Sequence, residues 1–192
     1  MAYIETITNE QVAALQAVQF EGEIVVVDTP ALLEEACGHL AAQSIIGFDT
    51  ETRPSFTSGV TNKVALLQLY GGGKCFLIRL NRVQITKSLT DILSNQNILK
   101  IGAAVKNDIV GLNKLRHFTA GGFVDLQDKV ESYGIKDKSL RKISGIVLGK
   151  KVSKAQRLSN WEAKTLTPQQ QVYAATDAWV CVEIYKSLSH LS

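Results

Sequence analysis

Cysteine and histidine are scarce in this sequence of 192 residues, which contains three of each. The cysteines are odd in number, far apart and set in apolar stretches, which predicts buried, reduced thiols rather than a disulfide framework. No histidine has the spacing to a cysteine that zinc sites use. No run of 18 apolar residues occurs, so we expect no membrane-spanning helix. The first residues lack the pattern of a secretory signal, and with the free thiols this predicts a cytoplasmic protein.

The length fits a single domain over residues 1–192, large enough to bury an apolar core without disulfides or structural zinc. No internal repeat, low-complexity stretch or linker interrupts it. Near the start, Thr8-Asn9-Glu10-Gln11 is a capping-box pattern that predicts a helix from Asn9 to about Val18. We expect residues 1–20 to form a helical brace at the amino terminus of the domain.

Charge is distributed unevenly along the chain. The net charge is +3, but residues 136–157, here called the basic segment, contain eight basic residues and one acid and so carry +7, leaving −4 for the rest. A positive segment can hold phosphates and an acidic remainder can hold metal ions, which suits a polyanionic substrate. A solvated helix face accounts for the same charges equally well.

The pattern of apolar and turn residues predicts an α/β fold with a mixed sheet of five to six strands. Strands expected at 45–51, 64–70 and 75–80 follow one another through short connections and so pair antiparallel. After residue 87, helices and strands alternate, which is typical of parallel strands with crossover helices on the faces of a sheet. Further strands are expected at 24–27, 99–103 and 123–126, and helices at 30–42, 87–93, 106–118, 127–133, 139–148 and 167–188.

Two carboxylates follow an apolar run in Ile45-Ile46-Gly47-Phe48-Asp49-Thr50-Glu51. Because side chains alternate along a strand, Asp49 and Glu51 point to one face and Thr50 points to the other. Like charges so close resist joint ionisation unless a cation lies between them. The pair therefore indicates a divalent-metal site, although acids at the solvated end of a strand give the same pattern.

Two further acids lie where metal chemistry could use them. Asp108 falls in the first turn of a helix that follows a buried strand, where the helix dipole also favours an acid. Tyr173 and Asp177 are four residues apart and so share one helix face. Asp177 precedes an apolar stretch in which an unpartnered carboxylate is costly. The small Ala174 and Ala175 beside it permit another element to approach closely.

Together these residues resemble the three exonuclease motifs of the DEDD superfamily in its tyrosine form. The motifs are Asp49-x-Glu51, Asp108 and Tyr173-x-x-x-Asp177, in that order and at these separations. The resemblance is greatest to ribonuclease D and to the exonuclease domain of the Werner syndrome protein, and it covers nearly all of the chain beyond residue 20. Supporting similarity lies at residues 63–69, 159–161, 166–167 and 171–178.

The resemblance implies a ribonuclease-H-like fold with helices on both faces of the sheet. It also implies 3′-to-5′ hydrolysis of DNA or RNA to nucleoside 5′-monophosphates with two divalent ions, for which oxygen ligands favour Mg²⁺ or Mn²⁺. It assigns Asp49 to both ions, Glu51 and Asp177 to the ion that activates water, and Asp108 to the other ion. Tyr173 would orient the attacking water, because a phenol with a pKa of about 10 is a poor base at neutral pH.

The expected partner is nucleic acid, with single-stranded 3′ ends as the expected form. Lys106, Asn107 and Arg157 could contact phosphates. Trp161 could stack on a base or instead pack the start of the final helix. Thr50, between the two acids of the first motif, is a further candidate for substrate contact.

Many relatives carry an aromatic residue directly after the first-motif glutamate, where this chain has Thr52, and Phe56 is the candidate replacement for base stacking. Two other functions remain open. One is a nucleic-acid-binding module with the same fold and no activity. Loss of one acid would indicate such a module, and all four acids and the tyrosine are present. The other is a phosphohydrolase of small nucleotides. A steep salt dependence of binding indicates a polymer substrate, and a shallow one a mononucleotide.

Overall fold

The structure is a computed structural model that describes residues 3–57, 59 and 62–189. Its main sheet has six strands in the order β2-β5-β4-β3-β6-β7. β4 pairs antiparallel with β3 on one side and with β5 on the other. The parallel pairs are β2 with β5, β3 with β6, and β6 with β7. The predicted mixed sheet is therefore confirmed. Its strands are β2 (Glu23–Val27), β3 (Ile45–Thr52), β4 (Val64–Gly71), β5 (Lys74–Arg79), β6 (Leu99–Gly102) and β7 (Phe123–Asp125).

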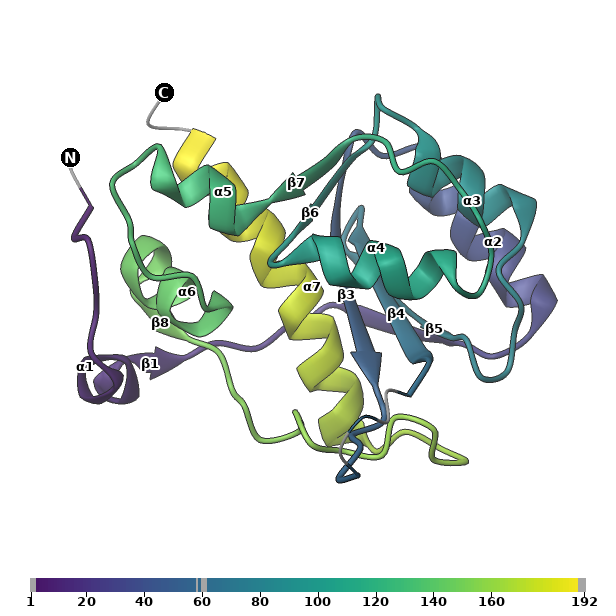
Figure 1. The fold of residues 1–192 in the computed structure, drawn as a ribbon, viewed down its shortest axis with the longest axis horizontal. Helices are drawn as coiled ribbons and strands as arrows, with labels where there is room; N and C mark the ends of the chain where they lie inside the picture. The colour runs from purple at the N-terminus through teal and green to yellow at the C-terminus, as the bar shows by residue number, and fades with distance from the viewer. Residues whose placement is uncertain (1–2, 58, 60–61, 190–192) are drawn as a thin grey trace.

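Helices cover both faces of this sheet (Figure 1). On one face, α2 (Pro30–Ala41), α3 (Lys87–Ser94) and α4 (Val105–Asn113) bury a core that includes Leu33, Leu89 and Leu112. The long helix α7 (Pro168–Ser189) crosses the opposite face, with α5 (Leu126–Glu131) and α6 (Leu140–Leu148) beside it. Helix α7 thus packs against the face that carries Asp49 and Glu51.

The N-terminal helix is shorter than the sequence predicts. The predicted capping box is present, but α1 (Asn9–Ala14) ends where Leu15 takes an extended conformation, instead of continuing to about Val18. The next residues form β1 (Gln16–Ala17), which pairs in parallel with β8 (Lys150–Lys151). Pairing with a distant segment therefore overrides the local helical preference. We call residues 13–22 the N-terminal arm; residues 1–2 of the expected brace lie outside the described residues.

Helix α4 also ends earlier than expected, at Asn113 rather than Phe118. The side-chain oxygen of Asn113 accepts the backbone N–H of Phe118 at 2.9 Å. A side chain that captures a backbone donor in this way competes with continuation of the helix. The apolar pattern continues to Phe118 because the side chain of Phe118 is buried in the core, although its backbone is not helical.

All three cysteines are buried and free, as predicted. Among the residues that the structure describes, none of the helices combines the length and the hydropathy of a membrane-spanning segment.

Candidate active site

An unusually close contact between β3 and α7 brings the proposed site together. A Cβ atom added to Gly47 would lie 2.0 Å from the carbonyl oxygen of Ala178, so only glycine allows this approach. The helix face at the contact is built from small buried residues, namely Ala174, Ala175 and Ala178. The close approach was expected at Ala174 and Ala175, and the backbone contact itself lies at Ala178. It brings Asp177, which precedes Ala178, beside the acidic end of β3.

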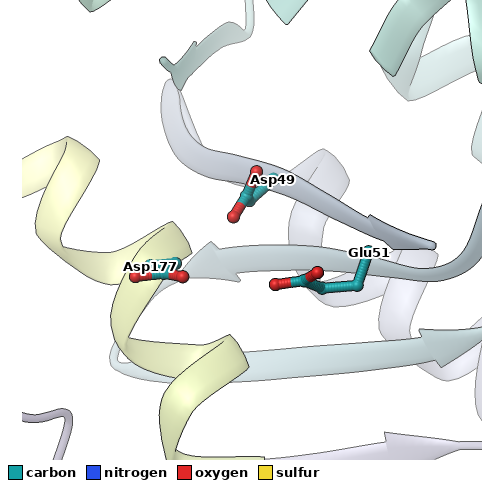
Figure 2. Close-up of side chains that lie close together, drawn as sticks. All are labelled: Asp49, Glu51 and Asp177. Carbon is teal, nitrogen blue, oxygen red and sulfur yellow. The ribbon is translucent and has the colours of Figure 1, made fainter. Parts of the chain in front are cut away.

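Three carboxylates from these two elements form one group, which we call the acid cluster. Oxygen atoms of Asp49, Glu51 and Asp177 all lie within 4.8 Å of one another. Figure 2 shows Asp49 and Glu51 on β3, with Asp177 on the helix that faces them. The alternation predicted for β3 therefore places both of its acids on the face toward α7. Asp177 is the most buried of the three, with 7% of its surface exposed.

Burial and mutual repulsion make the charged form of this cluster costly. Burial, followed by the charges of Asp177, Glu51 and Asp108, raises the pKa of Asp49 well above its ordinary value. Burial and the neighbouring acids raise the pKa of Glu51 to about 8. Among the described residues, no lysine, arginine or histidine forms an ion pair with the cluster. Converging oxygens with uncompensated charge are the donor set that a Mg²⁺ or Mn²⁺ ion fits.

Asp108 lies near the acid cluster without being part of its closest group. Its charge raises the pKa of Asp49 and of Glu51, but its oxygens are not among those within the 4.8 Å limit. The hydroxyl of Thr50, on the opposite face of β3, donates a hydrogen bond of 2.5 Å to Asp108. Burial raises the pKa of Asp108 to about 6, and this hydrogen bond opposes the rise. Thr50 therefore holds Asp108.

The start of α4 depends on an acid that the sequence analysis did not single out. Ala104, just before the helix, has a left-handed φ of 60°, which is strained for a residue with a Cβ. The carboxylate of Asp125, at the end of β7, accepts the backbone N–H groups of Ala104 and Val105 at 2.9 and 3.0 Å. Asp125 thus fixes the turn that presents Asp108. Asp125 falls inside the strand expected at 123–126, where no local pattern indicates a contact with the turn at Ala104.

Tyr173 lies one turn before Asp177. Burial raises the pKa of Asp177 to about 7, and the nearby hydroxyl of Tyr173 opposes that rise. Burial, and then the charge of Asp177, raises the pKa of Tyr173. The tyrosine is thus a neutral hydrogen-bonding group beside the acids. On its other side, the ring of Trp161 packs with centroids 6.0 Å apart and planes tilted by 34°.

The remaining expected substrate residues differ in their exposure. Trp161 has no exposed surface, so the expectation that it stacks on a base is wrong. It packs the start of α7, which was the alternative role given for it. Lys106 and Asn107 are exposed in the first turn of α4, two residues and one residue before Asp108. Arg157 is exposed in the chain between β8 and α7. These three are free to contact a ligand, and their roles remain predictions.

Gln68 is a polar residue at the site to which the sequence analysis assigned no role. It lies directly opposite Asp49 on the neighbouring strand β4. Gln68 is fully buried, and no described residue partners either its amide nitrogen or its amide oxygen. Directly paired residues on antiparallel strands share a face, with Cβ atoms about 5 Å apart. The unpartnered amide therefore lies on the face that carries the acid cluster, a feature visible only once the strand register is known.

The chain is similar in sequence to proteins of a known family. The 3′-5′ exonuclease family matches residues 24–191. Exonuclease 3′-5′ domain-containing protein 2 of Drosophila melanogaster is 36% identical over 164 residues, which cover 83% of this chain and 28% of that protein. The bifunctional 3′-5′ exonuclease/ATP-dependent helicase WRN of Mus musculus is 31% identical over 188 residues, covering 92% of this chain and 13% of that protein. The chain thus spans less than a third of either relative.

Solved structures agree with the sequence relatives. The crystal structure of the Aedes aegypti Nibbler EXO domain is similar with a TM-score of 0.80 and 25% sequence identity, covering 92% of this chain and 94% of that one. This likeness confirms the expected ribonuclease-H-like fold. Because the family match extends over nearly the whole chain and the fold agrees, this protein belongs to the 3′-5′ exonuclease family, within the DEDD superfamily that its motifs resemble.

Proposed function

We propose that this protein removes nucleotides one at a time from the 3′ end of DNA or RNA and releases nucleoside 5′-monophosphates. The observation that carries the proposal is the acid cluster, in which β3 and α7 bring three carboxylates together without a cationic partner among the described residues. Membership of the 3′-5′ exonuclease family supports the direction of cleavage. Metal-dependent hydrolysis is the activity that fits both the acid cluster and the family.

The acids would hold two divalent ions, Mg²⁺ or Mn²⁺. Asp49 would contact both, Glu51 and Asp177 the first, and Asp108 the second, as the motif resemblance assigns them. Such a pair of ions supplies activation of the attacking water and charge stabilisation at the leaving oxygen. The absence of any paired lysine or arginine in the described part of the cluster supports this assignment. Without a cation, burial would keep these carboxyls partly protonated at neutral pH.

The other residues of the site orient these groups. Tyr173 would hold the attacking water through its hydroxyl, and its raised pKa keeps it a hydrogen-bond donor rather than a base. Thr50 aims the Asp108 carboxylate through its 2.5 Å hydrogen bond. Lys106, Asn107 and Arg157, all exposed, would contact phosphates of the substrate.

The test is digestion of 5′-labelled single-stranded DNA and RNA with Mg²⁺ or Mn²⁺. We expect a descending ladder with the wild-type protein and none with Asp49→Ala or Asp177→Asn. Glu35→Gln is the matched control, because Glu35 is an exposed acid on α2, across the sheet from the cluster. Binding without cleavage by the wild-type protein would leave a nucleic-acid-binding module on an exonuclease fold. The preferred polymer identifies the substrate class.

Two broader proposals accompany this function. Residues 1–192 would act as one exonuclease domain, with the N-terminal helix as its brace; α1 and the chain before it pack near α6, where Ile7 donates its backbone N–H to Asp137 at 2.8 Å. The location would be cytoplasmic, which fluorescence microscopy of the tagged protein tests.

A further inference from the structure

A cleft of about 1260 Å³ lies between the N-terminal arm, the basic segment and α7. Its lining includes Tyr173 and Asp177, so the cleft is continuous with the proposed active site. Pockets for small ligands usually have volumes of about 300–1,000 Å³. The cleft therefore has room for more than a single small molecule beside the acid cluster.

The N-terminal arm forms one wall of the cleft and is firmly attached. The backbone N–H of Phe20 donates to the hydroxyl of Thr176 on α7 at 3.0 Å. The Phe20 ring packs against Tyr70 and Trp179, with centroids 5.5 and 6.0 Å away. Figure 1 shows the arm leaving β1 beside β8 and passing α7 on its way to β2. The wall is thus fixed by β-pairing at one end and by a buried aromatic residue at the other.

Seven of the eight basic side chains of the basic segment, all but Arg157, fall into two groups. Three lysines form ion pairs at 2.5–2.8 Å with nearby acids: Lys136 with Glu5, Lys138 with Glu131 and Lys142 with Asp137. Four other basic residues line the cleft and form no ion pair among the described residues: Arg141, Lys150, Lys151 and Lys154. The first group ties the segment to its surroundings. The second leaves uncompensated positive charge on the cleft wall.

The two central lysines of that wall also hold the arm. Lys151 donates from Nζ to the carbonyl oxygen of Ala13 at 2.5 Å, and Lys150 donates to the side-chain oxygen of Gln16. These acceptors are neutral, so both ammonium charges remain available to an anion in the cleft. Glu21 and Asp177 are the acids that line the cleft, against four basic residues.

Trp179 adds aromatic surface to the lining of the same cleft. Positive side chains beside an aromatic ring are the combination that single-strand binding grooves present to phosphates and bases. We propose that the N-terminal arm and the basic segment hold a single-stranded nucleic acid of several nucleotides in this cleft, with its 3′ end at the acid cluster. This inference rests on the proposed function, which sets the position of the 3′ end.

The arm precedes the segment that matches the family model. The family match begins at residue 24, whereas the arm ends at residue 22. The arm lines the cleft over several residues, so it would contact the substrate away from the bond that is cut. An oligonucleotide too short to fill the cleft contacts fewer of the basic side chains that line it. Affinity should therefore rise with oligonucleotide length up to roughly four to six nucleotides.

The test is fluorescence anisotropy of labelled single-stranded oligonucleotides of two to twelve nucleotides in EDTA, which measures binding without cleavage. The cleft variant is Arg141→Gln with Lys154→Gln, because neither side chain forms an ion pair with another described residue and both line the cleft. The matched control is Lys87→Gln with Lys114→Gln, which removes two exposed charges on the other side of the sheet. The cleft variant should bind a twelve-mer about tenfold more weakly and lower the salt slope by about 1.4.

Introducing a positive or a negative charge at one position of the arm tests whether the arm contacts the nucleic acid. Gln19 is exposed and lines the cleft. Gln19→Lys should tighten binding of the twelve-mer and Gln19→Glu should weaken it, each by about threefold. The same two changes at Gln96, which is exposed in the connection between α3 and β6, should leave affinity unchanged. A structural disturbance would move both Gln19 variants in the same direction.

The outcomes separate this inference from the proposed function. Weakened binding by the cleft variant, with opposite effects of the two Gln19 changes, supports the inference even if the wild-type protein cleaves nothing. Equal affinity and salt slope in the cleft and control variants, or no dependence on strand length, overturns it even if cleavage is observed. No binding of the twelve-mer by the wild-type protein at low salt also overturns it.

Discussion

Gly47 of β3 lies so close to Ala178 of α7 that a Cβ atom would come within 2.0 Å of the helix carbonyl oxygen. The contact sets the spacing between the strand that carries two acids and the helix that carries the third. Acids separated by 128 residues in the chain, Asp49 and Asp177, meet because of it. The geometry of the acid cluster is therefore set partly by a residue with no side chain.

Replacing Gly47 with alanine should displace α7 and separate the carboxylates. We expect a loss of about 1–3 kcal/mol in the free energy of unfolding, because the added methyl group overpacks a rigid contact with backbone. Exonuclease activity should fall by more than the folded fraction falls, measured under conditions where the variant is folded. The control is Gly38→Ala in α2, where a Cβ meets no atom within 4 Å and helix propensity predicts equal or higher stability. Wild-type activity in a folded Gly47→Ala protein would contradict this role of the contact.

Thr50→Val should weaken activity by removing the hydrogen bond to Asp108. That bond lowers the pKa of Asp108, so its loss raises the pKa and moves the acidic limb of the pH–rate profile to higher pH. The loss at neutral pH should be about fivefold, the usual effect of one hydrogen bond. Thr50→Ser keeps the hydroxyl and should keep the wild-type profile. If both variants show the same profile, the hydroxyl has no part in holding Asp108.

Divalent ions should stabilise the protein, and more so at higher pH. The folded-state pKa of Glu51, about 8, is above its ordinary value of 4.5, so between these values the folded state binds more protons than the unfolded state. Without metal, stability therefore falls as pH rises through this window. Mg²⁺ at about 100 times its Kd should add about 2.7 kcal/mol. Melting temperatures at pH 5 and pH 8, in EDTA and in Mg²⁺, measure both effects, and Glu51→Gln should flatten the decline in EDTA.

Gln68→Met should separate a role in the site from a role in the core. The amide of Gln68 has no partner among the described residues, so an apolar side chain of similar shape should leave stability unchanged or raise it. Activity should nevertheless fall, because a dipole opposite Asp49 is lost. Thermal unfolding and single-turnover cleavage measure the two effects. A fall of several kcal/mol in stability, with unchanged activity per folded molecule, would make Gln68 a structural residue.

Local patterns in the sequence were enough to predict much of the site. Strand alternation predicted that Asp49 and Glu51 share a face, and the helical repeat predicted the same for Tyr173 and Asp177. The helix expected at 167–188 is present as α7. A capping box begins it, with the Thr167 hydroxyl accepting the Gln170 N–H at 3.2 Å and the Gln170 side chain accepting the Thr167 N–H at 2.9 Å.

Features that depend on distant pairing could not be predicted in this way. The β1–β8 pair has two residues on each side, too few to show any periodicity. The sequence therefore predicted that α1 continues into the N-terminal arm, to about Val18. The position of Gln68 opposite Asp49 depends on strand register, and the turn that Asp125 fixes depends on tertiary contact. Trp161 read equally as a stacking or a packing residue until its burial was known.

The most direct test of the proposed function is release of the terminal nucleotide from an oligonucleotide labelled in its 3′-terminal residue. With Mg²⁺ or Mn²⁺, the wild-type protein should release labelled nucleoside 5′-monophosphate as its first product, whereas EDTA or Asp49→Asn should abolish the release. Glu35→Gln should match the wild-type protein. Release of longer labelled fragments, of nucleoside 3′-monophosphate, or at equal rates in EDTA would contradict a metal-dependent 3′-to-5′ exonuclease built on the acid cluster.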